Sequence, residues 1–436
     1  MGRFLPLLAG LVSSTWGLPW APACAQATVP AGTNTTAVTN AGPVSAAADS
    51  LWTRSTLGGS WFGVQPFLKA HGVDFAVELT QFASGLVAGD GAKDWEYGGK
   101  VDLWLKVDGP AIGLWRGFSI GARAQENYGH SPDEAGLTLV PINASLAIPG
   151  PGDGDVGVSL TQKFSDTVTL TAGKMNMMDS AKATPLKGGG GIDTFMNTAL
   201  AVPVTGLMPP EILGGLLSIR TQPVSYLLAV YDSLSAAHRS IFDEPFSEGV
   251  SFRASATLAA KPWGRSGFYG LKAMCSTRRG FDLRFIPDLL LPAVEGTLPT
   301  TSATPFYVGV SIQQYIWQDA TNPQRGWGFF GEIGMSDGNP TPQRWAAYGG
   351  VGGTGPFAGR EADRWGLAVF CNSLSSHVVG ALWPLLELRD EQGFEAYYNF
   401  SLTPWMYLTP DVQVISPFIQ GEPHAVFASF RLNLKF

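Results

Sequence analysis

The sequence predicts an all-β protein, a 16-stranded antiparallel transmembrane β-barrel of an outer membrane with a short N-terminal helix. Three observations support this class: a secretory signal at the start, alternation of apolar and polar residues from Val73 onwards, and a final strand ending in the aromatic Phe436. Segments of about ten residues with a period of two are typical of transmembrane strands, whose two faces meet lipid and water.

Composition agrees with a wall that is apolar outside and polar inside. Only 14% of the 436 residues are charged, against about 25% in ordinary soluble domains, while 45% are hydrophobic and 14 are Trp. Beyond the N-terminus there is no uninterrupted apolar run of about 18 residues, which excludes a bundle of membrane helices. A net charge of −7 without clustered Lys and Arg argues against nucleic acid as a partner.

The first residues predict export from the cytoplasm. Arg3 precedes a short apolar core over residues 4–12, and small residues surround two candidate cleavage sites over 23–27. This layout is typical of a bacterial signal peptide, which we assign to residues 1–27. Lipid modification of Cys24 is a weaker alternative, because the preceding residues lack the expected Leu. Residues 28–56 are rich in Thr, Ala, Pro and Gly and predict a flexible leader.

Residues 57–72 predict a short helix at or in the periplasmic mouth of the barrel. Trp61, Val64 and Phe67 fall on one face, Ser60 is a candidate N-cap and Gly72 a candidate stop.

The barrel is expected over residues 73–436. A soluble sandwich would show the same alternation, because any half-buried sheet has a period of two. The last strand favours the membrane: its apolar residues alternate with Arg431, Asn433 and Lys435 and end at Phe436. Such an ending resembles the signal read by the outer-membrane barrel assembly machinery, an expected partner together with the outer-membrane lipids.

Sixteen strands are counted, and an even number places both ends of the chain in the periplasm. Closure is required, because every backbone N–H and C=O needs a partner in lipid. The strands are expected to start near residues 73, 97, 117, 157, 167, 213, 225, 247, 267, 304, 327, 344, 364, 392, 405 and 426. The long segments 128–156, 177–212, 280–303 and 373–391 are expected as outer loops.

Cys275 and Cys371 are expected to be unpaired thiols on the barrel wall. Their predicted strands are four apart, or roughly 19 Å at about 4.8 Å per strand, which is too far for a disulfide. Neither lies in a CxxC or zinc-like pattern, and no cofactor is expected.

Several short motifs resemble the OprB-type family of carbohydrate-selective porins. The motifs are LGGSW (57–61), HGVDF (71–75), GGGIDTFMN (189–197), DRWGL (363–367), QGFEAYYN (392–399), LTPW (402–405) and LTPD (408–411). The resemblance spans about residues 57–436, with Ser60 in place of the family's usual Asp. It implies a 16-stranded porin for passive diffusion of small sugars. A general or small-organic-anion porin is the alternative of the same class, and association into a homotrimer is left open.

Alternation nominates the side chains that line the lumen. Sugar selection needs hydrogen-bonding groups, for which the planar donor fork of Arg is suited, and aromatic faces for stacking. The pore-lining candidates are Arg123, Arg220, Arg253, Lys100, Glu78 and Glu332, with Asp193 from the long loop. The alternative for each is an ordinary wall charge paired with a neighbour. We expect Arg123→Ala and Arg253→Ala to weaken block of the channel by sugar.

Trp104 occupies a lumen position and has three interpretations. It could stack on sugars, pack beneath the N-terminal helix, or belong to an interfacial belt. The Trp residues beside predicted turns, including Trp115, Trp263 and Trp405, are expected in such a belt.

Segment 177–212 is the candidate for a loop that folds into the barrel, with a surface lid as the alternative. Its run Gly188–Gly191 lacks the Lys-Ser/Thr of a phosphate loop. An outer-membrane hydrolase is the remaining alternative, although the sequence has no GxSxG or HExxH and its five His are scattered.

Overall fold

The computed structural model describes residues 50–132, 137–147, 150, 152–182, 184–202, 208–289 and 304–436. The predicted signal peptide, 1–27, and the leader up to residue 49 lie outside the described residues.

Sixteen strands form within the described ranges, as predicted, and each begins within three residues of its expected start. The first eight are β1 (Val73–Ala88), β2 (Trp95–Asp108), β3 (Phe118–Gly129), β4 (Gly154–Lys163), β5 (Val168–Asn176), β6 (Glu211–Arg220), β7 (Val224–Asp232) and β8 (Val250–Ala260). The others are β9 (Gly267–Ser276), β10 (Phe306–Gln318), β11 (Gly326–Ser336), β12 (Gln343–Thr354), β13 (Arg364–Leu374), β14 (Glu391–Thr403), β15 (Met406–Ser416) and β16 (Ala425–Lys435).

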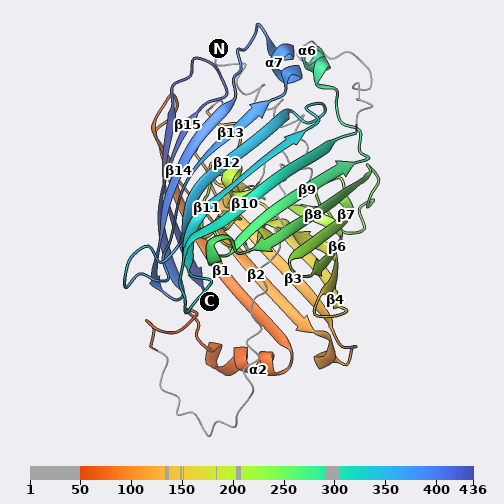
Figure 1. The fold of residues 1–436 in the computed structure, drawn as a ribbon, viewed down its shortest axis with the longest axis vertical. Helices are drawn as coiled ribbons and strands as arrows, with labels where there is room; N and C mark the ends of the chain where they lie inside the picture. Colours follow the sequence, from red (N-terminus) through yellow and green to blue (C-terminus); the bar gives the residue numbers. More distant parts are fainter. Residues whose placement is uncertain are drawn as a thin grey trace.

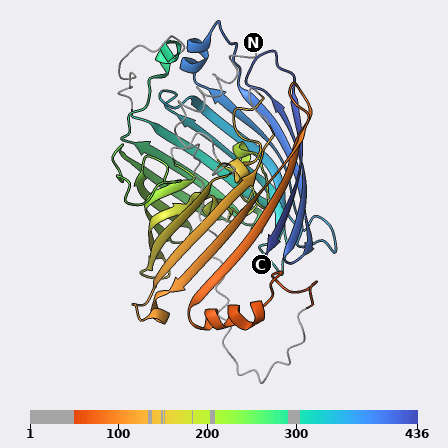
Figure 2. The same ribbon diagram turned by 180° about the vertical axis from the view of Figure 1, so that it is seen from behind.

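The strands form one closed antiparallel barrel (Figures 1 and 2). Each strand pairs with its neighbours in sequence, and β1 pairs with β16 to close the ring, for example with Thr80 opposite Asn433. Closure leaves no open sheet edge, which satisfies the backbone within a bilayer. Among the described helices, none is long and apolar enough to span a bilayer.

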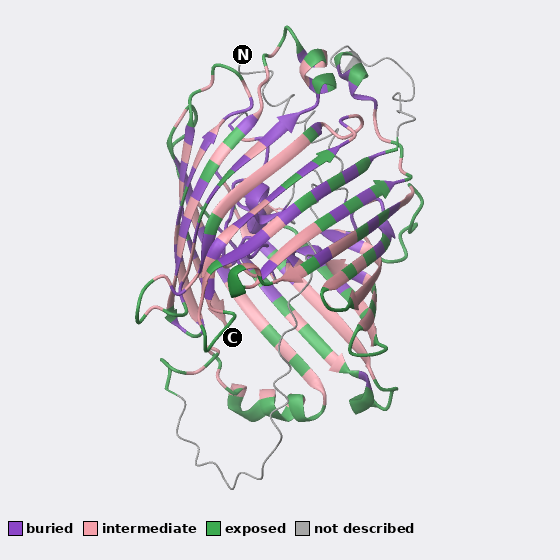
Figure 3. Cartoon of the chain, viewed as in Figure 1, coloured by how far each residue is buried: buried purple, intermediate pink, exposed green. Residues whose placement is uncertain are grey.

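The wall is polar inside and apolar outside, as the alternation predicts. On β2, Val101, Leu103 and Leu105 are exposed outward, whereas Lys100 and Asp102 are buried toward the lumen. Many strands carry this alternation, which Figure 3 shows as bands of buried and exposed residues.

The two ends of the barrel differ in their connections. At one end, here called the turn end, successive strands are joined by at most nine residues, the number between β2 and β3. The four predicted outer loops are all attached to strands at the opposite end, here called the loop end. The helix α2 (Val64–Ala70) and Phe436 lie at the turn end, opposite α7 (Ser376–Leu382) (Figure 1).

The segment between β5 and β6, here called the inner loop (177–210), folds into the barrel rather than over it. Its residues Phe195 and Leu200 pack in one apolar cluster with wall residues of the lumen face, including Phe330 and Tyr397. Part of the β3–β4 connection joins the same cluster, for example Ile142. The apolar cluster therefore fills the lumen beside β11–β16.

The helices are short. They are η1 (Trp61–Gly63), α2, η2 (Gly109–Ile112), α3 (Ala144–Ala147), α4 (Met177–Lys182), α5 (Thr198–Ala201), η3 (Pro262–Gly264), η4 (Leu283–Phe285), α6 (Ile286–Leu289) and α7. The expectation that Ser60 caps a helix with its side chain is wrong. A 3₁₀ turn intervenes, so the N-cap of α2 is Gly63 with φ 90°, and Ser60 makes no side-chain capping bond.

Cysteine and tryptophan placements test the wall assignment. Cys275 and Cys371 are unpaired, on β9 and β13, as expected. Trp115 and Trp263 are exposed beside turns, in keeping with an interfacial belt. Trp405 is instead covered, because the N-terminal segment lies over it and its indole N–H donates to the carbonyl of Leu51 at 2.7 Å.

Candidate functional site

Arg123 is the centre of the charged site in the lumen. Its guanidinium lies 2.6 Å from a carboxylate oxygen of Asp102, 2.9 Å from one of Asp179 and 3.6 Å from one of Glu211. These acids come from β2, α4 and β6, so one planar cation joins two parts of the wall to the inner loop. The side chain keeps 10% of its surface exposed. It therefore holds the carboxylates together while still facing the lumen.

Neighbouring groups fix the guanidinium in place. Arg123 also donates to Gln125 at 2.6 Å, and Gln125 donates to Glu211 at 3.0 Å. Lys100 approaches Asp102 to 3.4 Å and is almost fully buried. Charge-assisted bonds of this kind are shorter and stronger than neutral ones. The site is a nearly balanced set of cations and anions rather than a patch of one sign.

Trp104 lies beside this set, on the lumen face of β2. Its indole N–H donates to Asp179 at 2.9 Å, and the Lys182 ammonium lies 4.6 Å from the ring centroid. The guanidinium of Arg123 lies 5.5 Å from the same centroid. The interpretations as an interfacial belt residue or as a contact of the N-terminal helix are wrong, because the ring faces α4 inside the barrel.

The short helix α4 carries Asp179 and Lys182, the two charges of the inner loop that lie beside Trp104. The N–H of Met178 donates to Asn176 at 2.8 Å, which caps the start of α4 and orients it. Lys182 lies 3.6 Å from Asp179 and 3.9 Å from Glu78 of β1. Burial raises the pKa of the Asp179 carboxyl, but the positive charges of Arg123 and Lys182 together outweigh this effect. The pKa of Asp179 therefore lies below its usual range. The carboxylate is ionised at neutral pH.

Two cavities inside the wall flank α4. The first, here called the Arg123 chamber, has a volume of about 540 Å³ and is lined by the lumen faces of β1–β6 and by α4. Its lining includes Trp104, Arg123, Ser159, Thr171 and Asp179. This volume lies in the range typical of small-molecule sites, about 300–1,000 Å³. Aromatic, guanidinium, carboxylate and hydroxyl groups share it.

The second cavity, here called the Asp193 basin, has a volume of about 560 Å³ and is lined by the inner loop, by β13–β16 and by two connections of the turn end. Arg364 lies 3.0 Å from Asp193, and Arg325 lies 3.2 Å from Asp319. Glu78 and Lys182 line the same basin. These ion pairs are partly exposed, so solvent weakens them relative to the Arg123 set.

The inner loop is held in the lumen by buried polar contacts, here called the loop anchor. Glu395 accepts hydrogen bonds from the backbone N–H groups of Met196 and Asn197. Arg431, which is fully buried, donates to the carbonyls of Gly191 at 2.7 Å and Thr194 at 2.8 Å. The GGGIDTFMN and QGFEAYYN motifs therefore contact each other, and their role is to hold the inner loop against the wall.

Not every predicted pore-lining residue faces open space. Trp104 and Arg123 line the Arg123 chamber, and Glu78 and Asp193 line the Asp193 basin. Arg220 does not join either set: it is the last residue of β6 and is exposed at the turn end.

Three other candidates are buried instead of lining the channel. Lys100 and Arg253 are each 2% exposed, and the Arg253 guanidinium lies 3.4 Å from the sulfur of Met208, in the inner loop. Glu332 forms an ion pair with Lys272. Alternation assigned the correct face to all three, but loop residues and neighbouring wall side chains cover them. They are structural charges of the wall, which corrects their assignment as pore-lining.

Some residues of the two cavities are not identified by the sequence pattern. Asp179 and Lys182 lie in the long loop, which has no alternation, and Arg364 stands out only as part of the DRWGL motif. Arg364 is the first residue of β13, where alternation gives no warning that a loop residue will approach it. Within the described ranges, no group of three or more His, Cys, Asp or Glu side chains is placed to hold a metal ion.

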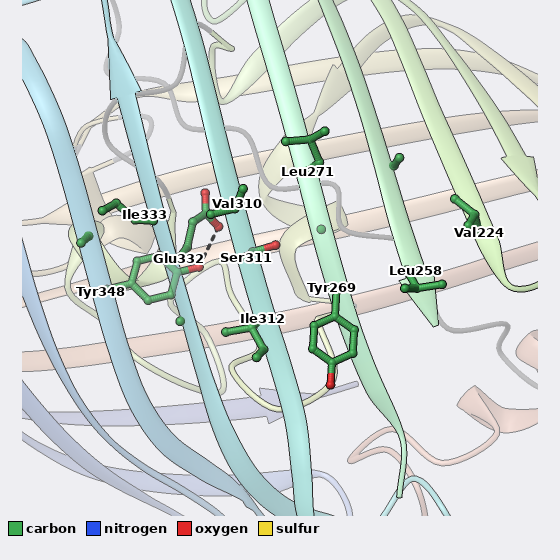
Figure 4. Close-up of a pocket in the computed structure, with 14 residues that line it drawn as sticks. Val224, Leu258, Tyr269, Leu271, Val310, Ser311, Ile312, Glu332, Ile333 and Tyr348 are labelled. Atoms are coloured by element: carbon green, nitrogen blue, oxygen red, sulfur yellow. Dashed lines mark hydrogen bonds between the residues drawn. The ribbon is translucent and has the colours of Figure 1, made fainter. Parts of the chain in front are cut away.

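A further concavity, of about 750 Å³, lies on the outside of the wall (Figure 4). It is lined by outward side chains such as Leu258, Leu271, Val310 and Ile333, all exposed. Glu332 and Tyr348 extend from the opposite face, where they are hydrogen-bonded at 3.0 Å. The concavity is apolar and belongs to the lipid-facing surface, so it is not part of the lumen site.

The geometry can be compared with known proteins. The model of the family described as "Carbohydrate-selective porin, OprB family" matches residues 92–436. No curated protein sequence matches the chain. Among solved structures, the high-pH form of OprB from Pseudomonas putida is similar, with 17% identity and a TM-score of 0.76 over 89% of this chain and 100% of that one.

Two further structures are similar at lower TM-score. The low-pH form of the same Pseudomonas putida protein has 15% identity and a TM-score of 0.52 over 88% of this chain and 99% of that chain. The outer-membrane channel DcaP of Acinetobacter baumannii has 9% identity and a TM-score of 0.52 over 84% and 97%. At these identities the likeness concerns the fold.

Proposed function

Because the chain belongs to the OprB family of carbohydrate-selective porins, we propose that sugars cross its outer-membrane barrel through the Arg123 chamber, where Arg123, Trp104 and Asp179 select them. The single observation that carries this proposal is the joining of three carboxylates by one partly exposed guanidinium beside an indole ring. This combination offers fixed donors, fixed acceptors and an aromatic face in one cavity.

The chemistry suits a neutral polyol. Guanidinium N–H groups donate to sugar hydroxyls, while the Asp179 carboxylate accepts from them. The indole of Trp104 presents a flat apolar face to the C–H side of a pyranose ring, an arrangement typical of aromatic side chains in binding sites. Because the charges are nearly balanced, a single ion gains little from entering. The donors and acceptors are already paired with one another, so a sugar exchanges bonds without leaving a charge unpaired.

The route also includes the Asp193 basin, on the other side of α4 from the Arg123 chamber. Glu78 and Lys182 line the Asp193 basin together with Asp193, Arg364 and Arg325. A succession of weak polar contacts favours passage, because a channel must bind its solute and still release it. No covalent step or cofactor is needed for this transport.

We propose further that the turn end faces the periplasm. The even strand number, the short turns and the position of Phe436 at that end support this orientation. The same proposal includes a signal peptide over residues 1–27 and recognition of the last strand by the barrel assembly machinery. It also includes association of the barrel into a homotrimer. Cross-linking of the protein in native membranes, followed by size determination, tests the trimer.

Swelling of liposomes that contain the purified protein tests the function. Glucose and a disaccharide are expected to enter faster than neutral amino acids of comparable size. Equal rates for sugars and size-matched amino acids would make the barrel a general porin. Preferential entry of small organic anions would favour the other alternative.

A further inference from the structure

The N-terminal segment 51–71 is attached to the outside of the barrel, not to its lumen. The ring of Trp61 meets that of Phe75 edge-on, with 5.3 Å between centroids. Phe75 is paired with Leu105, which is exposed on the outer face, whereas Glu78 of the same strand faces inward. The N–H of Leu57 donates to the last residue of β16, Lys435. The segment therefore lies along the outer wall at the turn end.

This segment exposes aromatic and aliphatic side chains in place of burying them. Phe62 is fully exposed, Val64 is half exposed and Phe67 is more than half exposed. The backbone of Trp61 and Phe62 has φ values of 50° and 56°, a left-handed conformation that bulky residues rarely adopt. This conformation directs the Trp61 ring onto the wall and leaves the Phe62 ring uncovered. Water is an unfavourable environment for such a surface.

Charge in the segment is of one sign. Between residues 50 and 72 there are two formal cations, Arg54 and Lys69, and no Asp or Glu, although the whole chain has a net charge of −7. Lys69 is exposed on α2. Amphipathic segments that lie in a membrane interface combine aromatic side chains with cations in this way, because anionic headgroups attract the cations.

The surface is continuous with the lipid-facing wall. The end of α2 adjoins the β2–β3 turn, where Gly72 accepts a hydrogen bond from Asp108 and exposed Trp115 follows. Phe164 and Trp263 are exposed in other turns of the same end. Aromatic residues at this level form the belt that marks the membrane interface of a barrel.

We propose that residues 51–71 are an interfacial membrane anchor, whose occupant is the phospholipid surface of the leaflet at the turn end. Phe62 and Phe67 enter the boundary between headgroups and acyl chains, while Arg54 and Lys69 contact lipid phosphates. The anchor holds the rim of the barrel at a fixed depth and leaves its mouth clear. This proposal does not depend on which solute the channel carries.

Spin labels on single cysteines test the anchor in the full-length protein. In a background with Cys275 and Cys371 replaced by Ser, labels are attached at Phe62→Cys, at Lys69→Cys as the matched position on the polar side of the segment, and at Leu103→Cys as a lipid-facing reference. The proteins are placed in vesicles of phosphatidylethanolamine and phosphatidylglycerol. Collision rates with oxygen, which concentrates in lipid, and with a water-soluble nickel complex are then compared.

The label at position 62 is expected to behave like the one at 103, with oxygen collisions favoured over nickel, whereas the label at 69 favours nickel. Equal access of nickel to positions 62 and 69 would place the segment in water and overturn the proposal. Protection of position 62 from both reagents would also overturn it, by showing cover from a second copy, another protein or the barrel mouth. Unchanged migration of the folded barrel on unheated gels confirms that each variant is folded.

Discussion

The lumen beside β11–β16 and the lumen beside β2–β5 are built from the same alternating strands, yet one is filled and the other is open. Beside β11–β16 the inner loop packs Phe195 and Leu200 against wall residues, and Glu395 and Arg431 bind its backbone. Beside β2–β5 the wall presents Trp104 and Arg123 to a cavity of about 540 Å³. The wall sets the diameter of the barrel, whereas the loop anchor decides which side of the lumen is filled.

Removing the loop anchor is expected to have the largest effect. Arg431→Ala deletes charge-assisted hydrogen bonds to the carbonyls of Gly191 and Thr194, and such bonds contribute about 1.5–3 kcal/mol each. The inner loop should leave the filled side, which raises single-channel conductance in planar bilayers and removes discrimination between sugars and amino acids.

Asn433→Ala is the matched control for this change. Asn433 lies two residues further on the same strand and face, but it bonds Thr80 of the wall instead of the inner loop. It should keep wild-type conductance. Equal conductance of wild type and Arg431→Ala would show that the filled side does not depend on this anchor.

Arg123→Ala is expected to have the next largest effect, on the open side. It removes the donor fork and leaves the carboxylates of Asp102, Asp179 and Glu211 without their shared cation. Loss of charged hydrogen bonds of about 1.5–3 kcal/mol corresponds to roughly tenfold weaker sugar block or more. Reversal potentials in a salt gradient should shift toward cation selectivity.

Arg253→Ala is expected to have a much smaller effect than Arg123→Ala, because the Arg253 guanidinium is covered by Met208 and the residue is only 2% exposed. The sequence treats the two arginines alike, but the structure predicts that only Arg123→Ala weakens block strongly. Current-noise measurements with a disaccharide give the sugar-binding constant of each variant. Equal losses in the two variants would contradict the division into open and covered charges.

Trp104→Leu is expected to weaken sugar block by a smaller factor. An aromatic contact contributes about 0.5–1.5 kcal/mol beyond its buried area, so the loss is roughly twofold to tenfold. Trp104→Phe retains an aromatic face but loses the bond to Asp179, and it should keep most of the block. Equal loss of sugar block in Trp104→Phe and Trp104→Leu would show that the indole positions α4 and does not stack on sugar.

Asp193→Asn is expected to have the smallest effect. Asp193 pairs with Arg364 across the basin, but its side chain is 39% exposed, and partly exposed pairs contribute about 0–1 kcal/mol. The backbone carbonyl of Asp193 still accepts from Asn399, so the inner loop keeps its place. Conductance and sugar block should match the wild type. A large rise in conductance would mean that surface ion pairs, and not the loop anchor, hold the filled side.

The strands could be predicted from the sequence because lipid imposes their pattern locally. A residue of β2 such as Leu103 must be apolar regardless of what fills the lumen, and its neighbours Asp102 and Trp104 then face inward. The strand number, the strand starts and the inward face of Arg123 all follow from this rule. The terminal strand predicts the outer-membrane location, and the resemblance of the motifs to the family predicts that the solute is a sugar.

Alternation does not reveal how deeply an inward residue is covered, because the cover comes from loops distant in sequence. Arg123 and Arg253 share a face and a residue type, yet only one reaches the chamber. Asp179 and Arg364 are brought into the cavities by the path of the inner loop, which has no periodicity to read. The apolar composition of segment 177–212 was the available signal that it would be buried.

The most direct test of the account is the reactivity of two cysteines placed by conservative substitution. Ser159→Cys lies on the lumen face of β4 in the Arg123 chamber, and Ser429→Cys lies on the lumen face of β16, where the side chain is 2% exposed. A water-soluble thiol reagent should reduce single-channel current in Ser159→Cys, more slowly when a disaccharide is present, and leave Ser429→Cys unchanged. Rapid reaction at position 429 with none at 159 would contradict the route proposed for the sugar.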